Sequence, residues 1–227
     1  MALARNPLLV AWQRYVVSAR HSRRSYSQEG EDLAIDRLIG GSEKGFYVEV
    51  GCHHPYRFSN TYLFYRRGWR GLCIDPLPGT RILFARHRPR DIVVEMGVAE
   101  RAGTLSYYMF NEPALNTFDE RTARERDGQT GYRIEKVVPV ITAPLAAILA
   151  THAAGERIDF MSVDVEGLDL QVLQSNDWSK YRPRVVVAEL LKAGAVSLES
   201  DPVSAFLISL GYRPHAKTGH SVIFMET

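Results

Sequence analysis

Hydrophobic and polar positions along the chain follow two patterns. Short runs rich in β-branched and aromatic residues predict strands, and apolar residues that recur three or four positions apart predict helices. In the first part of the chain the predicted strands are residues 46–50, 71–75 and 91–96, and the predicted helices are residues 26–39, 59–65 and 80–87. Glycine or proline follows several of these runs, as expected where helices and strands end.

The second part of the chain resumes this alternation after an interruption. Residues 104–110 predict an extra strand, and residues 111–136 are polar, charged and without periodicity, which predicts a long loop or lid. The remaining predicted elements are strands at 158–163 and 184–190, helices at 144–152, 168–173 and 203–210, and a hairpin at 211–225.

Strands that alternate with helices predict an α/β fold with a doubly wound, Rossmann-like sheet. Such a sheet is mostly parallel, and the C-terminal hairpin adds antiparallel strands to it. We expect a basic helical arm, residues 1–25, followed by one domain, residues 26–227, with the loop or lid near 111–136. Ligands of such folds bind beyond the carboxyl ends of the strands, so the residues that follow each strand are the candidates for chemistry.

Composition and charge agree with a folded domain. The 227 residues are 45% hydrophobic and 24% charged, which excludes a disordered or low-complexity chain. The net charge of +2 hides an asymmetry, because five arginines precede the first acidic residue, Glu29. Without these arginines acidic residues outnumber basic ones, which argues against a nucleic-acid partner bound across the domain.

The N-terminal arm interleaves its arginines with apolar side chains such as Leu8, Trp12 and Val16. Two interpretations stay open: a helix packed against the domain, and peripheral contact with an anionic membrane surface. The arm lacks the uninterrupted apolar core of a signal peptide, and no apolar run reaches transmembrane length. We therefore expect a cytoplasmic protein, and no pattern indicates its oligomeric state. Cys52 and Cys73 are expected to be buried, reduced thiols.

The ends of the first two predicted strands favour a nucleoside ligand. Gly51 follows the first strand, where a glycine lets a ligand approach the backbone closely. The single glycine does not form the Gly-x-Gly-x-x-Gly pattern of pyrophosphate sites. Asp75 ends the second strand about 20 positions after Gly51, the spacing at which a carboxylate holds a ribose diol.

Three acidic residues follow the later strands. Asp164 and Glu166 end the strand at 158–163, and Glu189 lies near the end of the strand at 184–190. Gathering these acids in one crevice costs free energy unless a cation, a proton or a positively charged ligand compensates their charge. His53 and His54 adjoin the same edge of the sheet and are alternative bases.

Several of these segments together resemble the FkbM family of methyltransferases. The match spans roughly residues 27–190, and the family implies a class I S-adenosylmethionine-dependent fold and O-methylation of hydroxyls, often on sugars, glycans or secondary metabolites. Many relatives carry Glu where this chain has Asp75, and both side chains can hold a ribose. The segments that carry the resemblance are Ser27-Gln28, Glu31-Asp32, Phe46 to Gly51, Pro55, Ser59-Asn60-Thr61, Gly68-Trp69, Asp75-Pro76, Arg88-Pro89 and Ile158 to Gly167.

S-adenosylmethionine fits the candidate residues in kind. Its ribose is expected at Asp75, and its adenine near Gly97 and Val98, just after the third strand. Its sulfonium is the positive ligand that an acid-lined pocket containing Asp164 accepts. Its amino-acid end is expected at the turn of Glu49 and Gly51 and at the helix start formed by Ser59, Asn60 and Thr61.

An alcohol is a poor nucleophile, so a base or a metal must activate the acceptor. We expect Asp164 or Glu166 to be that base, with His53 or His54 as the alternative. Asp164 and Glu189 could instead hold Mg²⁺, which prefers carboxylate oxygens. Five basic residues in the loop or lid are candidates for recognising the acceptor: Arg121, Arg124, Arg126, Arg133 and Lys136.

Two rival functions remain open at this point. The segment Asp164-Val165-Glu166 is similar to the Asp-x-Asp of metal-dependent glycosyltransferases, which predicts binding of a nucleotide sugar with Mn²⁺. A non-catalytic binding module on the same scaffold predicts no turnover and tolerance of substitutions at Asp164. The convergence of Gly51, Asp75 and the strand-end acids favours the O-methyltransferase over both.

Overall fold

Side chains of the first strand alternate between two hydrophobic layers. In the computed structural model, which describes Trp12, Val16 and residues 21–190 and 198–227, strand β1 (Phe46–Val50) is buried along its whole length. Val48 and Val50 pack into one core and Tyr47 into another on the opposite face of the sheet. A strand that is buried on both faces needs helices on both sides.

The central sheet has seven strands in the order β3-β2-β1-β7-β8-β10-β9. Strands β3, β2, β1, β7 and β8 run parallel, and β10 is antiparallel to both β8 and β9. The predicted mostly parallel sheet with an antiparallel C-terminal hairpin is therefore confirmed. The strands beyond β1 are β2 (Arg70–Ile74), β3 (Ile92–Val94), β7 (Phe160–Val163), β8 (Val185–Glu189), β9 (Tyr212–Lys217) and β10 (Ser221–Glu226).

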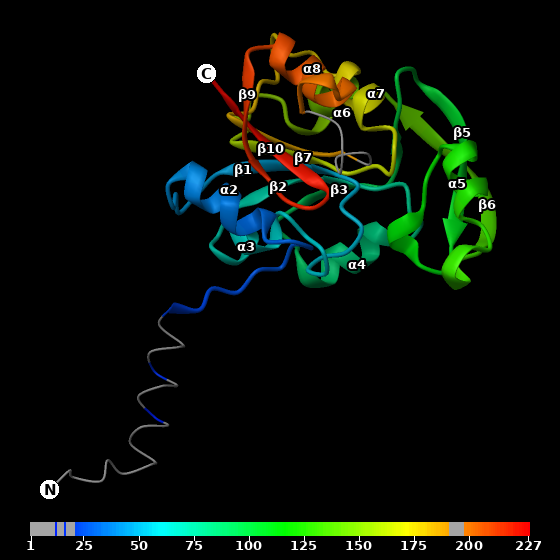
Figure 1. The fold of residues 1–227 in the computed structure, drawn as a ribbon, viewed down its shortest axis with the longest axis horizontal. Coiled ribbons are helices and arrows are strands. Elements are labelled where there is room, and N and C mark those ends of the chain that lie inside the picture. Colours follow the sequence, from blue (N-terminus) through cyan, green and yellow to red (C-terminus); the bar gives the residue numbers. More distant parts are fainter. Residues whose placement is uncertain (1–11, 13–15, 17–20, 191–197) are drawn as a thin grey trace, which may run out of the picture.

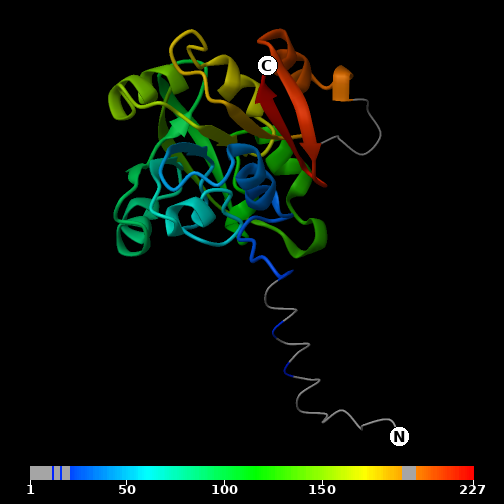
Figure 2. The same cartoon turned by 90° about the vertical axis from the view of Figure 1, so that its left-hand side faces the viewer.

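Two layers of helices cover the sheet, as Figures 1 and 2 show. One layer packs with Val48 and Leu72, the other with Tyr47 and Phe160. The first layer contains α6 (Leu145–His152), α7 (Asp169–Gln174) and α8 (Pro202–Ser209), and the second contains α2 (Glu31–Ile39), α3 (Tyr62–Arg66) and α4 (Thr80–His87). Among the described residues, none of the helices has the length and apolar character needed to cross a membrane.

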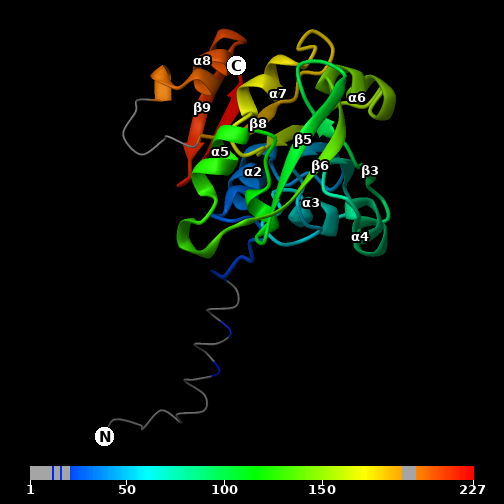
Figure 3. The same cartoon turned by 90° about the vertical axis from the view of Figure 1, so that its right-hand side faces the viewer.

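A second sheet of three strands stands beside the first, with the order β4-β6-β5 (Figure 3). Its strands are β4 (Gly97–Val98), β5 (Gly103–Phe110) and β6 (Ile134–Ala143). Sequence analysis predicted β5 but neither β4 nor β6. Strand β6 begins with charged residues and contains Pro139 opposite Ser106, and a proline within an apolar run is a signal against a strand.

Residues 111–136 differ from the predicted single long loop. They contain the short 3₁₀ helices η1 (Pro113–Leu115) and η2 (Gln129–Gly131), helix α5 (Glu120–Arg126) and the start of β6. Helix α5 shows no apolar periodicity because Ala123 is its one buried side chain. Its N-terminus is instead capped by Asp119, whose carboxylate accepts hydrogen bonds from the backbone of Arg121 and Thr122. Residues 111–136 are called the insert below.

Helix α2 also starts later than predicted, at Glu31 rather than Tyr26. The preceding segment forms a turn around Asp32, whose carboxylate accepts hydrogen bonds from Ser25 Oγ, Ser27 Oγ and the backbone N–H of Tyr26. Such side-chain bonds to nearby backbone compete with helix formation. Most of the predicted N-terminal arm lies outside the described residues.

Candidate active site

A cavity opens where β1, β2 and β7 end. Six of the residues predicted from the sequence line it: Gly51, His53, Asp75, Val98, Asp164 and Glu166. The other predicted residues do not line this cavity: Glu49, His54, Ser59, Asn60, Thr61, Gly97 and Glu189. The crevice beyond the carboxyl edge therefore brings together about half of the predicted set.

Gly51 joins the ends of three strands. Its φ of +81° lies in the left-handed region, and a Cβ atom here would stand 1.8 Å from the backbone oxygen of Asp164. Its N–H donates a hydrogen bond of 2.9 Å to the carbonyl of Ile74. Glycine is thus required because two backbones approach closely at the floor of the cavity.

Asp75 is buried at the end of β2 and holds two loops in place. Its carboxylate accepts hydrogen bonds from the backbone N–H groups of His53, at 2.7 Å, and Leu77, at 2.8 Å. Burial raises the pKa of Asp75 to about 6, and these two hydrogen bonds oppose the rise. Each carboxylate oxygen retains a lone pair for a ligand in the cavity that it lines.

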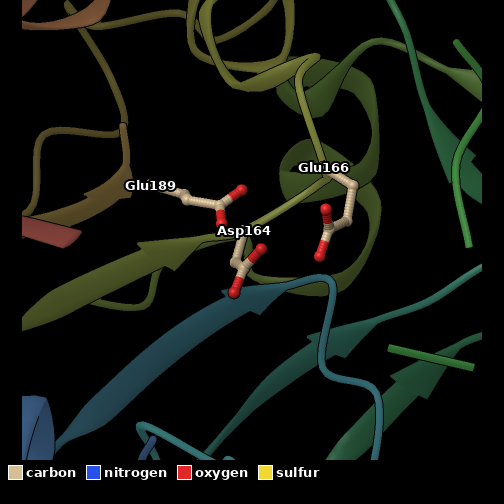
Figure 4. Close-up of side chains that lie close together, drawn as sticks. All are labelled: Asp164, Glu166 and Glu189. Carbon is tan, nitrogen blue, oxygen red and sulfur yellow. The ribbon is translucent and has the colours of Figure 1, made fainter. Parts of the chain in front are cut away.

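Asp164, Glu166 and Glu189 form an acid cluster, with one oxygen of each lying within 4.8 Å of the others (Figure 4). Asp164 and Glu189 approach from the ends of neighbouring strands, and Glu166 from the loop after β7. Asp164 is exposed to solvent, whereas Glu166 is half-buried. Glu189 Oε2 is buried and has no hydrogen-bond partner among the described residues.

Like charge and burial shape the titration of this cluster. Burial, followed by repulsion from Asp164 and Glu166, raises the pKa of Glu189 to about 10. Burial and the neighbouring Glu166 also raise the pKa of Asp164 well above its usual value. The pKa of Glu166 is raised by burial against the opposing effect of Arg126. Burial and like charge therefore disfavour ionisation of the cluster, and a bound cation would offset this effect.

Arg126 belongs to helix α5 of the insert, and its guanidinium pairs with the Glu166 carboxylate at 2.5 Å. Thr117 Oγ1 donates a second hydrogen bond, of 3.2 Å, to the Glu166 carbonyl. The insert also lines the cavity with Asn116 and Phe118. It thus contacts both the cavity and the acid cluster.

The two histidines have different surroundings. His53 lines the cavity and has a φ of +47°. Its Nε2 is buried and has no hydrogen-bond partner among the described residues. Burial, assisted by Arg57, lowers the pKa of His53 to about 4, so the ring is neutral at pH 7. His54 Nδ1 instead accepts hydrogen bonds from the backbone of Tyr56 and Arg57. The pKa of His54 is lowered by burial as well.

Glu49 points away from the cavity into a buried network. Its carboxylate accepts hydrogen bonds from Thr61 Oγ1 at 2.5 Å, the Asn60 N–H at 3.1 Å and Ser59 Oγ at 3.4 Å. Burial raises the pKa of Glu49, and Arg88 opposes this rise from 3.7 Å. These contacts fix the turn before α3, so the structure gives Glu49, Ser59 and Thr61 a positioning role behind the cavity wall.

Arg88 is the centre of that network, although sequence analysis noted it only within the family resemblance. Its side chain is fully buried and pairs with Asp91 at 2.6 Å. It also donates hydrogen bonds to Thr61 Oγ1 at 2.8 Å and to Tyr47 Oη at 3.0 Å. The available signal was its position after α4, where an arginine directly precedes a proline.

The predicted adenine end of the cavity is apolar. Val98 is buried and lines it together with Met96 and Tyr107. Gly97 adjoins this wall, and a Cβ atom on it would stand 2.6 Å from Phe118 Cζ. Glycine at position 97 therefore lets the insert pack against β4.

The fold and cavity define a Rossmann-like enzyme domain with its site at the carboxyl edge of the sheet. Residues 49–214 match the sequence model described as the methyltransferase FkbM domain. The match covers most of the chain, so the protein belongs to the FkbM family of S-adenosylmethionine-dependent methyltransferases, and the sequence resemblance is confirmed.

Three solved structures with a similar fold are described as cofactor-bound or as methyltransferases. Cofactor-bound Rv0187 from MTB is 14% identical, with a TM-score of 0.46, and the alignment covers 100% of this chain and 94% of that one. The O-methyltransferase from Bacillus cereus in complex with SAH is 11% identical, with a TM-score of 0.48 and the same coverage. A TehB-like SAM-dependent methyltransferase from Corynebacterium glutamicum is 12% identical, with a TM-score of 0.44 and coverage of 98% and 100%. Among curated proteins, no sequence matches significantly.

Proposed function

We propose that the protein transfers the methyl group of S-adenosylmethionine to a hydroxyl oxygen of a sugar, glycan or secondary metabolite. The observation that supports this most strongly is that Gly51, Asp75 and Asp164 line one cavity at the carboxyl edge of the sheet. In an O-methyltransferase this cavity must hold a nucleoside at one end and an acceptor hydroxyl at the other.

In this proposal Asp75 binds the ribose hydroxyls through its free lone pairs, and Val98 packs against the adenine. The backbone at Gly51 faces the amino-acid end of the cofactor. Glu49, Ser59 and Thr61 act indirectly, because they hold the turn that precedes α3. Bound S-adenosylmethionine supplies an electrophilic methyl group on a positively charged sulfur.

We assign the general base to Asp164. Asp164 lines the cavity, and among the described residues its carboxylate makes no side-chain hydrogen bond or ion pair. Its raised pKa makes the ionised form a stronger base than an ordinary carboxylate. As the acceptor oxygen forms its bond to carbon, Asp164 takes the hydroxyl proton and the electron pair of the broken carbon–sulfur bond stays on sulfur.

The other candidate bases are less well suited. Glu166 forms an ion pair with Arg126. The pair favours the ionised form of Glu166 but leaves its carboxylate less free to accept a proton. The low pKa of His53 makes its neutral ring a weak base. The Nδ1 of His54 already accepts two backbone hydrogen bonds.

A divalent cation is a second way to activate the acceptor in this proposal. Asp164 and Glu189 offer carboxylate oxygens close together, and the unpartnered Glu189 Oε2 lacks any compensating donor among the described residues. Mg²⁺ bound there would lower the pKa of an acceptor hydroxyl. Removing Mg²⁺ with EDTA would then abolish methyl transfer while leaving cofactor binding intact.

The domain boundaries and the lid are part of the same proposal. Residues 26–227 would form the methyltransferase domain, and the insert would close over the acceptor through the contacts of Thr117 and Arg126 with Glu166. Limited proteolysis tests the lid: we expect slower cleavage within 111–136 when S-adenosylhomocysteine is bound. Equal cleavage rates with and without ligand would contradict a lid.

The enzymatic test measures S-adenosylhomocysteine release with a panel of monosaccharides and hydroxylated metabolites as acceptors. With an acceptor in hand, Asp164→Asn is expected to lower turnover about 100-fold or more, the range of general base catalysis, with little change in cofactor affinity. Glu43→Gln, an exposed substitution before β1, is the matched control. If Asp164→Asn and Glu166→Gln both keep near wild-type turnover, the assignment of the base is wrong.

A further inference from the structure

A second hollow opens beside the cofactor cavity. Gln28, Phe58 and Asp164 line both spaces. A ligand in the second hollow would therefore meet a ligand in the first at Asp164. This hollow is called the side pocket below.

The outer wall of the side pocket joins two segments that lie far apart in the sequence and are bonded to each other. The Glu29 carboxylate accepts hydrogen bonds from the His220 N–H, at 3.0 Å, and pairs with His220 Nδ1 at 2.8 Å. The Thr218 hydroxyl donates to Glu31 at 2.7 Å. These bonds join the turn between β9 and β10 to the segment before α2, so the outer wall of the side pocket is fixed.

The inner wall has hydrogen-bond acceptors that lack donors. Glu29 and Glu31 are satisfied within the wall, but Glu189 Oε2 is buried without a partner among the described residues. Asp164 likewise has no side-chain donor in the bonds that the described residues make. A buried acceptor without a donor is unfavourable, so a ligand that brings donors is favoured at this wall.

Charge narrows the class of ligand further. Of the described residues that line the side pocket, four are acidic and none is lysine or arginine. A phosphate or carboxylate on the ligand would find no lysine or arginine here to pair with, and its charge would further oppose ionisation of the acids. Phe58 is 43% exposed and adds an apolar surface for the carbon skeleton of a ligand.

We propose that the side pocket is the acceptor subsite and that it takes a hydroxyl with a second hydrogen-bond donor on the adjacent carbon. This inference rests on the proposed function, because it assigns the methyl donor to the larger cavity. One donor faces Asp164, where its hydroxyl is methylated, and the neighbouring donor meets Glu189. A 1,2-diol and a 2-amino alcohol share this chemistry, and an acceptor that is anionic next to its reacting hydroxyl is excluded.

The test uses the full chain saturated with S-adenosylhomocysteine and four small probes on one ring. The probes are trans-1,2-cyclohexanediol, trans-2-aminocyclohexanol, trans-1,4-cyclohexanediol and trans-2-hydroxycyclohexanecarboxylate. Ligand-observed NMR titration measures their affinities. We expect the 1,2-diol or the amino alcohol to bind at least tenfold more tightly than the 1,4-diol and the hydroxy acid.

Two outcomes would support the proposal, and they distinguish an ammonium from a hydroxyl as the donor that meets Glu189. An amino alcohol that binds more tightly than the 1,2-diol, and loses about tenfold in Glu189→Gln, identifies an ammonium at Glu189. Equal binding of both probes, with a small effect of Glu189→Gln, identifies a neutral diol. Glu43→Gln is the control, and because Glu189 does not line the larger cavity, S-adenosylhomocysteine affinity should be unchanged in both variants.

Two outcomes overturn the proposal while leaving methyl transfer intact. One is normal binding of S-adenosylhomocysteine with no preference among the four probes, or with no probe bound. The other is preferential binding of the hydroxy acid. Failure to bind S-adenosylhomocysteine at all would instead contradict the proposed function itself.

Discussion

Two groups of carboxylates lie near the end of β1, and they differ in whether hydrogen-bond donors and cations surround them. In the network around Arg88, Glu49 and Asp91 share a guanidinium and several hydroxyl donors. In the acid cluster, Asp164 and Glu189 lack such donors among the described residues. The first arrangement stabilises the fold. In the second, ionisation of the carboxyl groups is unfavourable until a cationic or donor-rich ligand binds.

The largest expected effect comes from removing the centre of the satisfied network. Arg88→Met leaves Glu49 and Asp91 buried without their cation, which should lower the free energy of unfolding by about 3–5 kcal/mol. Urea unfolding followed by circular dichroism measures this. Arg70→Met, which breaks the exposed pair with Glu156, is the control and should cost less than about 1 kcal/mol. Equal decreases in the free energy of unfolding in the two variants would show that the network stabilises the fold no more than an exposed ion pair does.

The second prediction concerns the junction between the two regions. Gly51→Ala places a Cβ atom against the Asp164 carbonyl at a positive φ, so β1 and β7 must separate at the cavity floor. We expect S-adenosylhomocysteine affinity to fall at least tenfold in calorimetric titrations. Gly79→Ala also has a positive φ, but its Cβ would meet nothing within 4 Å. It should cost about 1 kcal/mol of stability and leave binding unchanged; an unchanged affinity in Gly51→Ala would contradict the close approach.

The third prediction is the pH dependence of the acid cluster. The pKa of Glu189 is about 10 in the folded protein and near 4.3 in an unfolded chain, so the folded state holds the extra proton between these values. Stability should therefore fall as the pH rises through this window, by up to about 1.4 kcal/mol per pH unit. Glu189→Gln should remove part of this slope in urea unfolding at pH 5, 7 and 9. A slope that is identical in the variant would show that Glu189 ionises normally.

The smallest expected effect concerns the insert. Arg126→Gln breaks the ion pair with Glu166 and should speed proteolysis within residues 111–136 a few-fold. Arg121→Gln, on the same helix but paired only with the exposed Glu125, should leave the cleavage rate unchanged. Similar rates in Arg126→Gln and the wild type would mean that the ion pair does not hold the insert in place.

The elements that sequence patterns predicted are those formed by apolar runs with clear boundaries. Strand β1 and helix α4 were found because their apolar runs are short and bounded by glycine or proline. Helix α5 was missed because capping by Asp119 and charge pairs stabilise it, with only Ala123 buried. Strand β6 was missed because Pro139 lies within it. The proline is tolerated because β4 pairs only with Thr142 and Ala143, so the edge of β6 that faces away from β5 is unpaired by β4 at Pro139.

Residues of the site were also predicted where a local pattern exists and missed where distant segments meet. The rule that ligands bind at carboxyl strand ends brought Gly51, Asp75 and Asp164 to one cavity. The same rule could not tell that Glu49 turns to the opposite side, because its partner Arg88 lies far along the chain. Likewise, Arg126 becomes the partner of Glu166 only through the fold of the insert. Side-chain pairs between distant segments leave no local pattern.

The central claim is that the cavity bounded by Gly51, Asp75 and Asp164 holds S-adenosylmethionine. Isothermal titration of the protein with S-adenosylmethionine, S-adenosylhomocysteine and UDP-glucose, each with Mg²⁺ or with EDTA, tests it most directly. The account predicts that the first two bind with one-to-one stoichiometry, with or without Mg²⁺, and that UDP-glucose does not bind. Binding of UDP-glucose alone, or of none of the three, would contradict it.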